Sequence, residues 1–160
     1  MDVKFLDTTF RDGSQSLWAM GMRHGQIEAV AADMDQAGFQ AIEIPGNAIH
    51  FKKMISDLKE NPWNTMHMLA EKMPETPKSC MGGGLNLNTF GTPTPPVIGE
   101  LFWTRQAEIG ALQRLQLTSN TADQMTRTFP SFIPFLKGIG IKCALAISYF
   151  ISPRHTDELY

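Results

Sequence analysis

The stretch Phe5-Leu-Asp-Thr-Thr-Phe-Arg-Asp-Gly-Ser-Gln-Ser-Leu-Trp18 decides how the rest of the chain is interpreted. An apolar run rich in β-forming residues ends abruptly in charge and glycine at Arg11, Asp12 and Gly13. A strand that ends in an arginine and a carboxylate is typical of a parallel α/β barrel, where side chains at the carboxyl ends of the strands carry the chemistry. We therefore expect residues 4–10 to form the first strand and residues 11–22 to form a loop.

Composition and charge bound the class of protein. The chain has 160 residues and a formal net charge of −2, which suits one domain with a real core. It has no basic stripe of the kind that binds nucleic acid, and no run approaching the ~18–20 apolar residues of a membrane span. Cys80 and Cys143 lie in apolar runs and are expected to be buried free thiols, as in a reducing compartment. Because the amino terminus lacks a signal-peptide pattern, we expect a single cytoplasmic domain over residues 1–160.

Strand-like and helix-like segments alternate along the whole sequence. Such alternation predicts parallel strands with helices outside and right-handed crossovers. Two architectures fit this pattern, an open doubly wound sheet and an incomplete eight-stranded barrel. The predicted strands cover residues 4–10, 39–44, 78–81, 112–117 and 142–150, and the predicted helices cover residues 24–37, 49–59, 62–73, 96–109, 130–138 and 155–160.

Helix boundaries and buried faces follow from local signals. Gly38 stands where a C-cap glycine is expected, and Asn61 followed by Pro62 is typical of a helix start. Pro130 and Pro134 cannot donate a backbone hydrogen bond, so the helix before residue 138 is expected to begin near Pro130. Apolar spacing predicts two buried stripes, Ile27, Val30, Ala31 and Met34 in the first helix and Ile98, Leu101, Phe102 and Ile109 in the fourth.

Polar side chains near the first two strand ends are the candidates for chemistry. Asp12 would be a hard oxygen ligand for a metal, Arg11 would bind a carboxylate or enolate, and Gln15 would orient the ligand. The alternative is a surface turn with an ordinary Arg–Asp pair. Glu43 either accepts hydrogen bonds from Arg11 or is a solvated strand end.

Other residues with chemical potential have plainer interpretations. Gly82-Gly83-Gly84 lacks the spacing of a phosphate-binding loop and is expected to be a strand-end bend or a close backbone approach. The histidines show no metal-ligand spacing and are expected to be solvated helical residues; they are His24, His50, His67 and His155.

The opening stretch resembles a known family motif. Leu6-Asp-Thr-Thr-Phe-Arg-Asp-Gly-Ser-Gln-Ser-Leu17 is similar to the D-T-T-x-R-D-G/A-x-Q motif of the pyruvate-carboxyltransferase, or HMG-CoA-lyase-like, barrel superfamily. Its biotin-dependent carboxyltransferase branch includes the carboxyltransferase domain of pyruvate carboxylase, the oxaloacetate decarboxylase alpha subunit and the transcarboxylase 5S-type subunit. Further segments resemble that branch and extend the resemblance over essentially the whole chain, namely residues 15–23, 61–76, 84–86 and 146–160.

This resemblance implies a fold, a cofactor set and site residues. The fold is a parallel (β/α) barrel of the TIM type, truncated here to about five βα units. The cofactors are a divalent metal ion of the zinc, manganese or cobalt class and biotin on a partner carrier domain or subunit, and the substrate is a small oxoacid or acyl acceptor. Asp12 matches the metal-ligand aspartate, Arg11 and Gln15 match catalytic and substrate-contacting residues, and Glu43 and Asn86 match substrate-site positions.

The sequence also departs from the family pattern. A substrate-binding arginine is replaced by Gly83, so an oxoacid carboxylate would lose a contact worth about 1.5–3 kcal/mol. The family's carbamylated lysine and His-x-His lie on strands six and seven, and a barrel of this type needs about 250 residues. The remaining departures are Ser14, Pro45, Phe51 and the lack of an acidic residue near Leu117.

Three functions stay open on the sequence. The first is part of a biotin-dependent carboxyltransferase or decarboxylase. The second is an acyl-CoA lyase or aldol-type synthase on the same barrel, which Gly13 favours slightly and the 15–19 and 61–63 segments oppose. The third is a non-catalytic half-barrel subunit that pairs with a second chain, because open strand edges invite association.

Overall fold

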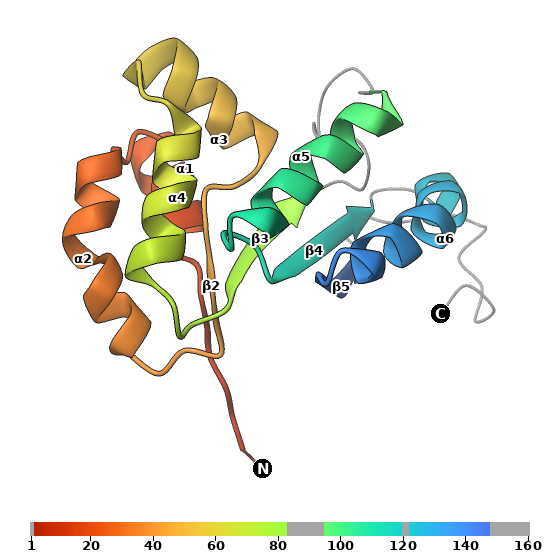
Figure 1. The fold of residues 1–160 in the computed structure, drawn as a ribbon, viewed down its shortest axis with the longest axis horizontal. Helices are drawn as coiled ribbons and strands as arrows, with labels where there is room; N and C mark the ends of the chain where they lie inside the picture. The colour runs from red at the N-terminus through yellow and green to blue at the C-terminus, as the bar shows by residue number, and fades with distance from the viewer. Residues whose placement is uncertain (1, 83–94, 120–121, 148–160) are drawn as a thin grey trace.

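The computed structural model describes residues 2–82, 95–119 and 122–147 (Figure 1). Within them lies one five-stranded sheet in which every neighbouring pair is parallel and the strand order is β1-β2-β3-β4-β5. A sequential order does not fit a doubly wound sheet, whose strand order reverses at a switch point. The strands are β1 (Leu6–Asp7), β2 (Ala41–Glu43), β3 (Lys78–Gly82), β4 (Arg114–Ser119) and β5 (Lys142–Ile147).

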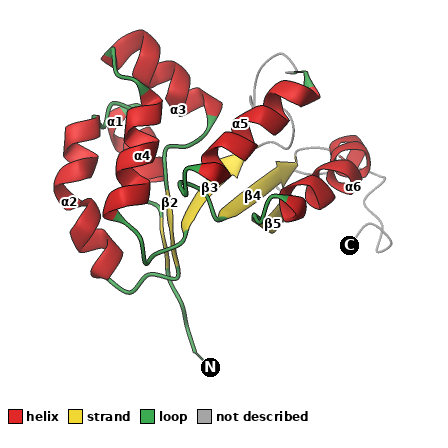
Figure 2. Ribbon diagram, in the orientation of Figure 1, coloured by secondary structure: helices red, strands yellow, loops and turns green. Residues whose placement is uncertain are grey.

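Helical segments lie between consecutive strands in the sequence, and Figure 2 shows these helices lying beside the strands that they connect. The parallel α/β architecture predicted from the alternation is therefore confirmed. Within the described residues, no helix combines the length and the apolar character needed to cross a bilayer. The helical segments are η1 (Thr9–Gly13), α1 (Ser14–Trp18), α2 (His24–Gln36), α3 (Ala48–Lys53), η2 (Met54–Leu58), α4 (Pro62–Lys72), α5 (Pro96–Glu108) and α6 (Ala122–Gly138), where η marks a π-helical turn.

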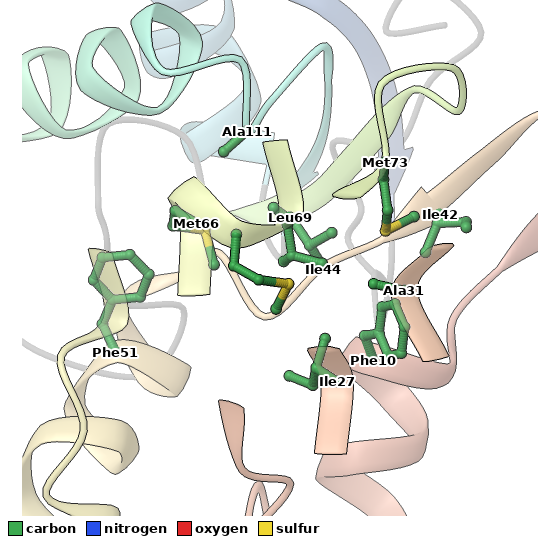
Figure 3. Close-up of a cluster of buried hydrophobic side chains, with 11 residues drawn as sticks. Phe10, Ile27, Ala31, Ile42, Ile44, Phe51, Met66, Leu69, Met73 and Ala111 are labelled. Atoms are coloured by element: carbon green, nitrogen blue, oxygen red, sulfur yellow. The ribbon is translucent and has the colours of Figure 1, made fainter. Parts of the chain in front are cut away.

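Two apolar clusters fill the space between the sheet and its helices. One lies under α2 and α4, where the fully buried Ile27, Met66 and Leu69 belong to one cluster with Ile42 of β2 (Figure 3). The second lies under α5 and α6 and includes Trp103, Leu115, Leu117, Phe132 and Leu136. Fully burying one large apolar side chain stabilises the fold by roughly 1.5–3 kcal/mol, so these clusters are the main source of stability.

The first strand is much shorter than predicted. The carboxylate of Asp7 accepts hydrogen bonds from the backbone N–H of Thr9 at 3.0 Å and from its hydroxyl at 2.9 Å. The Thr8 carbonyl then accepts from the N–H groups of residues 11, 12 and 13, which closes a π-helical turn. These local bonds compete with the sheet ladder, so residues 9–18 form η1 and α1, and the loop predicted over residues 11–22 holds only for residues 19–22.

Helix α2 matches its predicted boundaries to within one residue. Ile27 and Ala31 are fully buried, Met34 packs against the same cluster, and Gly38 has the positive φ of 78° expected after a helix end. Val30 is 43% exposed, so its predicted burial is wrong. Helix α4 starts as predicted, with the Asn61 side chain accepting from the backbone N–H of residue 63.

Helix α5 has the predicted extent to within one residue, but its predicted buried stripe holds only in part, because Phe102 and Ile109 pack against the core whereas the other two members do not. Ile98 and Leu101 are 45% and 62% exposed, whereas Trp103 and Gln106 are fully buried. The Gln106 side chain donates from Nε2 to the carbonyl oxygen of Gly46 at 2.8 Å. A polar residue at a buried position breaks the apolar stripe on which the prediction depended.

Helix α6 begins at Ala122 and not near Pro130, so that prediction is wrong. Pro130 and Pro134 are both exposed, whereas Phe132 and Leu136 are fully buried. Residues four apart share a helix face, so both prolines lie on the solvent side, where a helix can curve around its core.

A buried lysine joins the amino end of β3 to two helices. The Lys78 ammonium is almost fully buried and donates to the carbonyl oxygen of Met73 at 2.5 Å. Burial lowers the pKa of Lys78, and the nearby charge of Asp35 opposes that shift. Burial also raises the pKa of Asp35, but hydrogen bonds from the N–H groups of Thr76 and Glu75 outweigh it and lower that pKa overall.

Several sequence predictions fall outside the described residues or hold only in part. Gly83, Gly84, Asn86, residues 148–150 and the helix over 155–160 lie outside the described ranges. Cys80 and Cys143 are both free; Cys80 is fully buried, as predicted, and Cys143 is half-buried.

Gly82→Ala is expected to destabilise the fold by about 1–3 kcal/mol, because overpacking forces shifts in a filled core. A Cβ atom at Gly82 would lie 2.9 Å from Cζ2 of the fully buried Trp103. Denaturant unfolding measures the change. The matched control is Gly25→Ala, where no atom lies within 4 Å of the added carbon. Equal unfolding free energies for Gly82→Ala and the unmodified chain would contradict the close approach.

Candidate functional site

An ion pair at the ends of β1 and β2 forms the centre of the candidate site. Arg11, on η1, donates from Nε to Oε2 of Glu43 at 2.7 Å, and its Nη2 lies 2.5 Å from the same oxygen. The Glu43 side chain is 1% exposed and that of Arg11 is 12% exposed. Glu43 therefore accepts from Arg11, and the alternative of a solvated strand end is wrong.

Asp12 completes a group of three charges. Its Oδ1 accepts from Arg11 Nη1 at 2.9 Å and from the Ser16 hydroxyl at 3.4 Å. Its side chain is 50% exposed, in contrast to Glu43. Among the described residues Oδ2 of Asp12 has no hydrogen-bond partner, so this oxygen faces solvent and is open to a cation.

The turn that follows β1 explains why these side chains meet. Thr8 ends the strand, and η1 winds the chain so that Arg11 lies beside the last residue of β2. Neighbouring parallel strands present their carboxyl ends at the same edge of the sheet, which brings Glu43 to that place. The geometry thus joins Arg11, Asp12 and Glu43 as the sequence suggested.

Gln15 is the predicted site residue that the described geometry does not bring to this group. It lies on α1 and is exposed, and no hydrogen bond of its side chain is seen among the described residues. Asn86 lies outside the described ranges. The described residues also contain no group of three or more His, Cys, Asp or Glu side chains close enough to hold one metal ion. Asp12 is thus a single candidate ligand within this part of the chain.

His50, predicted to be solvated, is only 2% exposed, so that prediction is wrong. Oδ1 of Asn47, the N-cap residue of α3, accepts from the backbone N–H of His50 at 3.0 Å and lies 2.8 Å from ring Nδ1. Because that oxygen is an acceptor, Nδ1 carries the ring proton. Nε2 is buried and has no partner within hydrogen-bond distance among the described residues.

The environment keeps His50 neutral. Burial lowers the pKa of His50 to about 4, and the nearby Arg11 charge acts in the same direction, while the Arg11 backbone opposes both. The ring therefore lies close to the arginine that organises the site. Asn47, three residues before His50, was a sequence signal for an N-cap, but it carried no information about burial of the ring.

Comparison with known proteins gives a consistent result. No family model matches the chain. It is 34% identical over 158 residues to a pyruvate carboxylase subunit of Methanocaldococcus jannaschii, covering 99% of this chain and 27% of that protein. It is 28% identical over 160 residues to the methylmalonyl-CoA carboxyltransferase 5S subunit of Propionibacterium freudenreichii, covering 99% of this chain and 30% of that protein.

A solved structure agrees with these relatives. The carboxyl transferase domain of Rhizobium etli pyruvate carboxylase, solved with oxamate and biotin, matches with a TM-score of 0.80 and 25% identity. The match covers 91% of this chain and 24% of that chain. The carboxyltransferase resemblance is confirmed. The chain nevertheless spans less than a third of the length of these relatives.

Glu43→Gln is expected to destabilise this carboxyltransferase-like chain by about 3 kcal/mol, because removing one partner of a buried ion pair leaves the other charge uncompensated. The control is Asp12→Asn, because the half-exposed Asp12 carboxylate is expected to contribute no more than about 1 kcal/mol to its pair with Arg11. Denaturant unfolding of both variants checks the difference. Equal losses would show that the Glu43 carboxylate is not the main support of Arg11.

The unfolding free energy is expected to fall as the pH drops from 6.5 to about 4. In this window the unfolded chain binds a proton at His50 that the folded chain does not, and the loss is at most on the order of 3 kcal/mol. His50→Phe cannot take up this proton and should lose less stability between pH 7 and pH 4.5 than the unmodified chain. Parallel pH profiles for the two proteins would refute the assignment.

Proposed function

We propose that this chain is the amino-terminal part of a biotin-dependent carboxyltransferase or decarboxylase that moves CO₂ between carboxybiotin and a small oxoacid or acyl acceptor. One observation carries the proposal. A chain aligned over 99% of its length with an archaeal pyruvate carboxylase subunit holds a buried Arg11–Glu43 pair at the carboxyl ends of its first two strands. That is the edge of a parallel barrel at which catalysis occurs.

The net charge of the site favours binding of a cation first and of an anionic substrate second. Arg11 contributes one positive charge and Asp12 and Glu43 contribute two negative charges, so the group is formally −1. A divalent ion is attracted to such a group, and an anionic substrate is repelled until the ion is bound. Asp12, with its free oxygen, would supply one hard ligand.

The other candidate residues would then act on the acceptor. A bound divalent ion supplies Lewis-acid polarisation of the acceptor carbonyl. Arg11 keeps guanidinium N–H groups beyond those directed at Glu43 and Asp12, and these would bind the carboxylate or enolate oxygen of the acceptor. Glu43 fixes the guanidinium plane, while Gln15 and Asn86 are proposed to contact the substrate by resemblance to the family.

The remaining ligands are proposed to come from outside these residues. The sheet is sequential and parallel, and its relatives are more than three times as long. We therefore expect further strands, on a second chain or a carboxyl-terminal segment, to close the eight-stranded barrel. They would bring the family's lysine and His-x-His, and a biotin carrier domain or subunit would dock at the completed site.

The isolated chain is expected to bind a divalent ion weakly and to catalyse no transfer, because Asp12 is one ligand of several. Titration with Mn²⁺ followed by electron paramagnetic resonance checks the binding. Asp12→Asn should abolish it, whereas the control Asp33→Asn, an exposed residue of α2, should not. Tight binding of one metal ion per chain together with intact transfer of labelled CO₂ to biotin would overturn the proposed dependence on a partner.

A further inference from the structure

A row of polar side chains crosses the sheet on the face away from the helices. Glu43, Ser79, Arg114 and Lys142 are register partners on four neighbouring strands. Register partners share a face, and side chains alternate between the two faces along a strand. Leu115, next to Arg114 along β4, is fully buried in the cluster under α5 and α6. The row therefore lies on the inner face of the sheet.

Arg114 differs from the other arginines with described side chains. Arg11, Arg23 and Arg105 each have a carboxylate within 4 Å. Arg114 has none among the described residues, although it is half-buried. Its Nη1 donates to the hydroxyl of the fully buried Ser79 at 2.9 Å, which orients the guanidinium and leaves most of its N–H groups unused.

Lys142 places a second cation beside it. It is the register partner of Arg114 on β5, it is exposed, and it has no ion pair among the described residues. Neighbouring strands lie about 4.8 Å apart, so two like charges on register partners repel each other unless an anion lies between them. Glu43, at the far end of the row, is already paired with Arg11.

This pair of cations is separate from the candidate active site. Arg114 and Lys142 are the first residues of β4 and β5, whereas Glu43 is the last residue of β2. The row thus runs from the carboxyl end of one strand to the amino ends of two others. Within the row, two strand spacings of about 4.8 Å, or about 10 Å, separate Arg114 from Glu43. A ligand held by Arg114 and Lys142 would therefore lie farther along the row than the charges that we assign to catalysis.

We propose that Arg114, Lys142 and Ser79 form a carboxylate-binding site on the inner face of the sheet. The fork of Arg114 suits bidentate binding of a carboxylate, and Lys142 adds a second charged donor. The same chemistry can come from a free small dicarboxylate or from an aspartate or glutamate on the segment that completes the sheet. The existence of this site does not depend on the proposed function. Only its occupation by an aspartate or glutamate of a completing segment rests on that function.

The test follows the side-chain Nε–Hε resonance of Arg114 by NMR while oxalate is added to the metal-free chain at constant ionic strength. We expect a saturable shift of this resonance. Lys142→Gln should weaken the oxalate affinity by about tenfold, the effect of losing one charged hydrogen bond. Arg105→Gln, on the exposed face of α5, is the matched control and should leave the affinity unchanged.

Arg11→Gln separates this inference from the proposed function. Oxalate bound at the candidate active site would be lost in that variant, whereas the shift of Arg114 should persist. A shift that does not saturate, or that is unaffected by Lys142→Gln, would overturn the inner-face site. In the assembled protein, a shift of the Arg114 resonance on addition of oxalate would show that the natural ligand is a free dicarboxylate. A resonance that already has its oxalate-bound position before the addition would show that a protein carboxylate occupies the site.

Discussion

The burial of a carboxylate at the end of β2 is the constraint on which the site depends. Glu43 is almost completely removed from water, and an unpaired charge in that position would cost several kcal/mol. Arg11 compensates it through two nitrogens on one oxygen. The pairing requires the chain after β1 to turn back toward β2, which the Asp7 and Thr8 hydrogen bonds accomplish. The short first strand is thus part of the way the site is built.

A second buried charge lies on the neighbouring strand, where Lys78 is the register partner of Ile42, and it is accommodated by different means. The Lys78 ammonium has no carboxylate within 4 Å in the described residues, and it donates instead to the backbone carbonyl oxygens of Met73, at the end of α4, and of Thr76 in the following loop. The carbonyl oxygen at a helix end carries partial negative charge and stabilises the cation, and the nearby charge of Asp35 adds to this effect. Lys78 therefore has a structural explanation, whereas Glu43 and Arg11 lie with a half-exposed third charge, Asp12, that remains accessible to a ligand.

The sequence was sufficient for the order of the elements and for part of the site. Alternating segments and caps such as Asn61 and Gly38 are local signals, and the structure confirms what they predicted. Residues whose position depends on partners far along the chain were misjudged. The buried face of α5 depends on Gln106 reaching the backbone of Gly46, sixty positions earlier, and no local pattern encodes that contact. Burial of His50 was missed for the same reason, because it requires α3 to pack beside the Arg11 turn.

The two charged regions of the inner sheet lead to one view of how the protein is organised. At the carboxyl ends of the strands the charges are arranged as a net anion with one exposed oxygen, which favours a cation. Toward the amino ends of β4 and β5 the row carries cations without described counter-ions, which favours an anion. Opposite charges at two places along one row of the inner face limit what can cover it, since an apolar surface would desolvate Asp12 at one place and leave Arg114 and Lys142 without a counter-ion at the other. A complementary surface must present a cation or metal at one end and a carboxylate at the other, so the inner face specifies the register of whatever completes it.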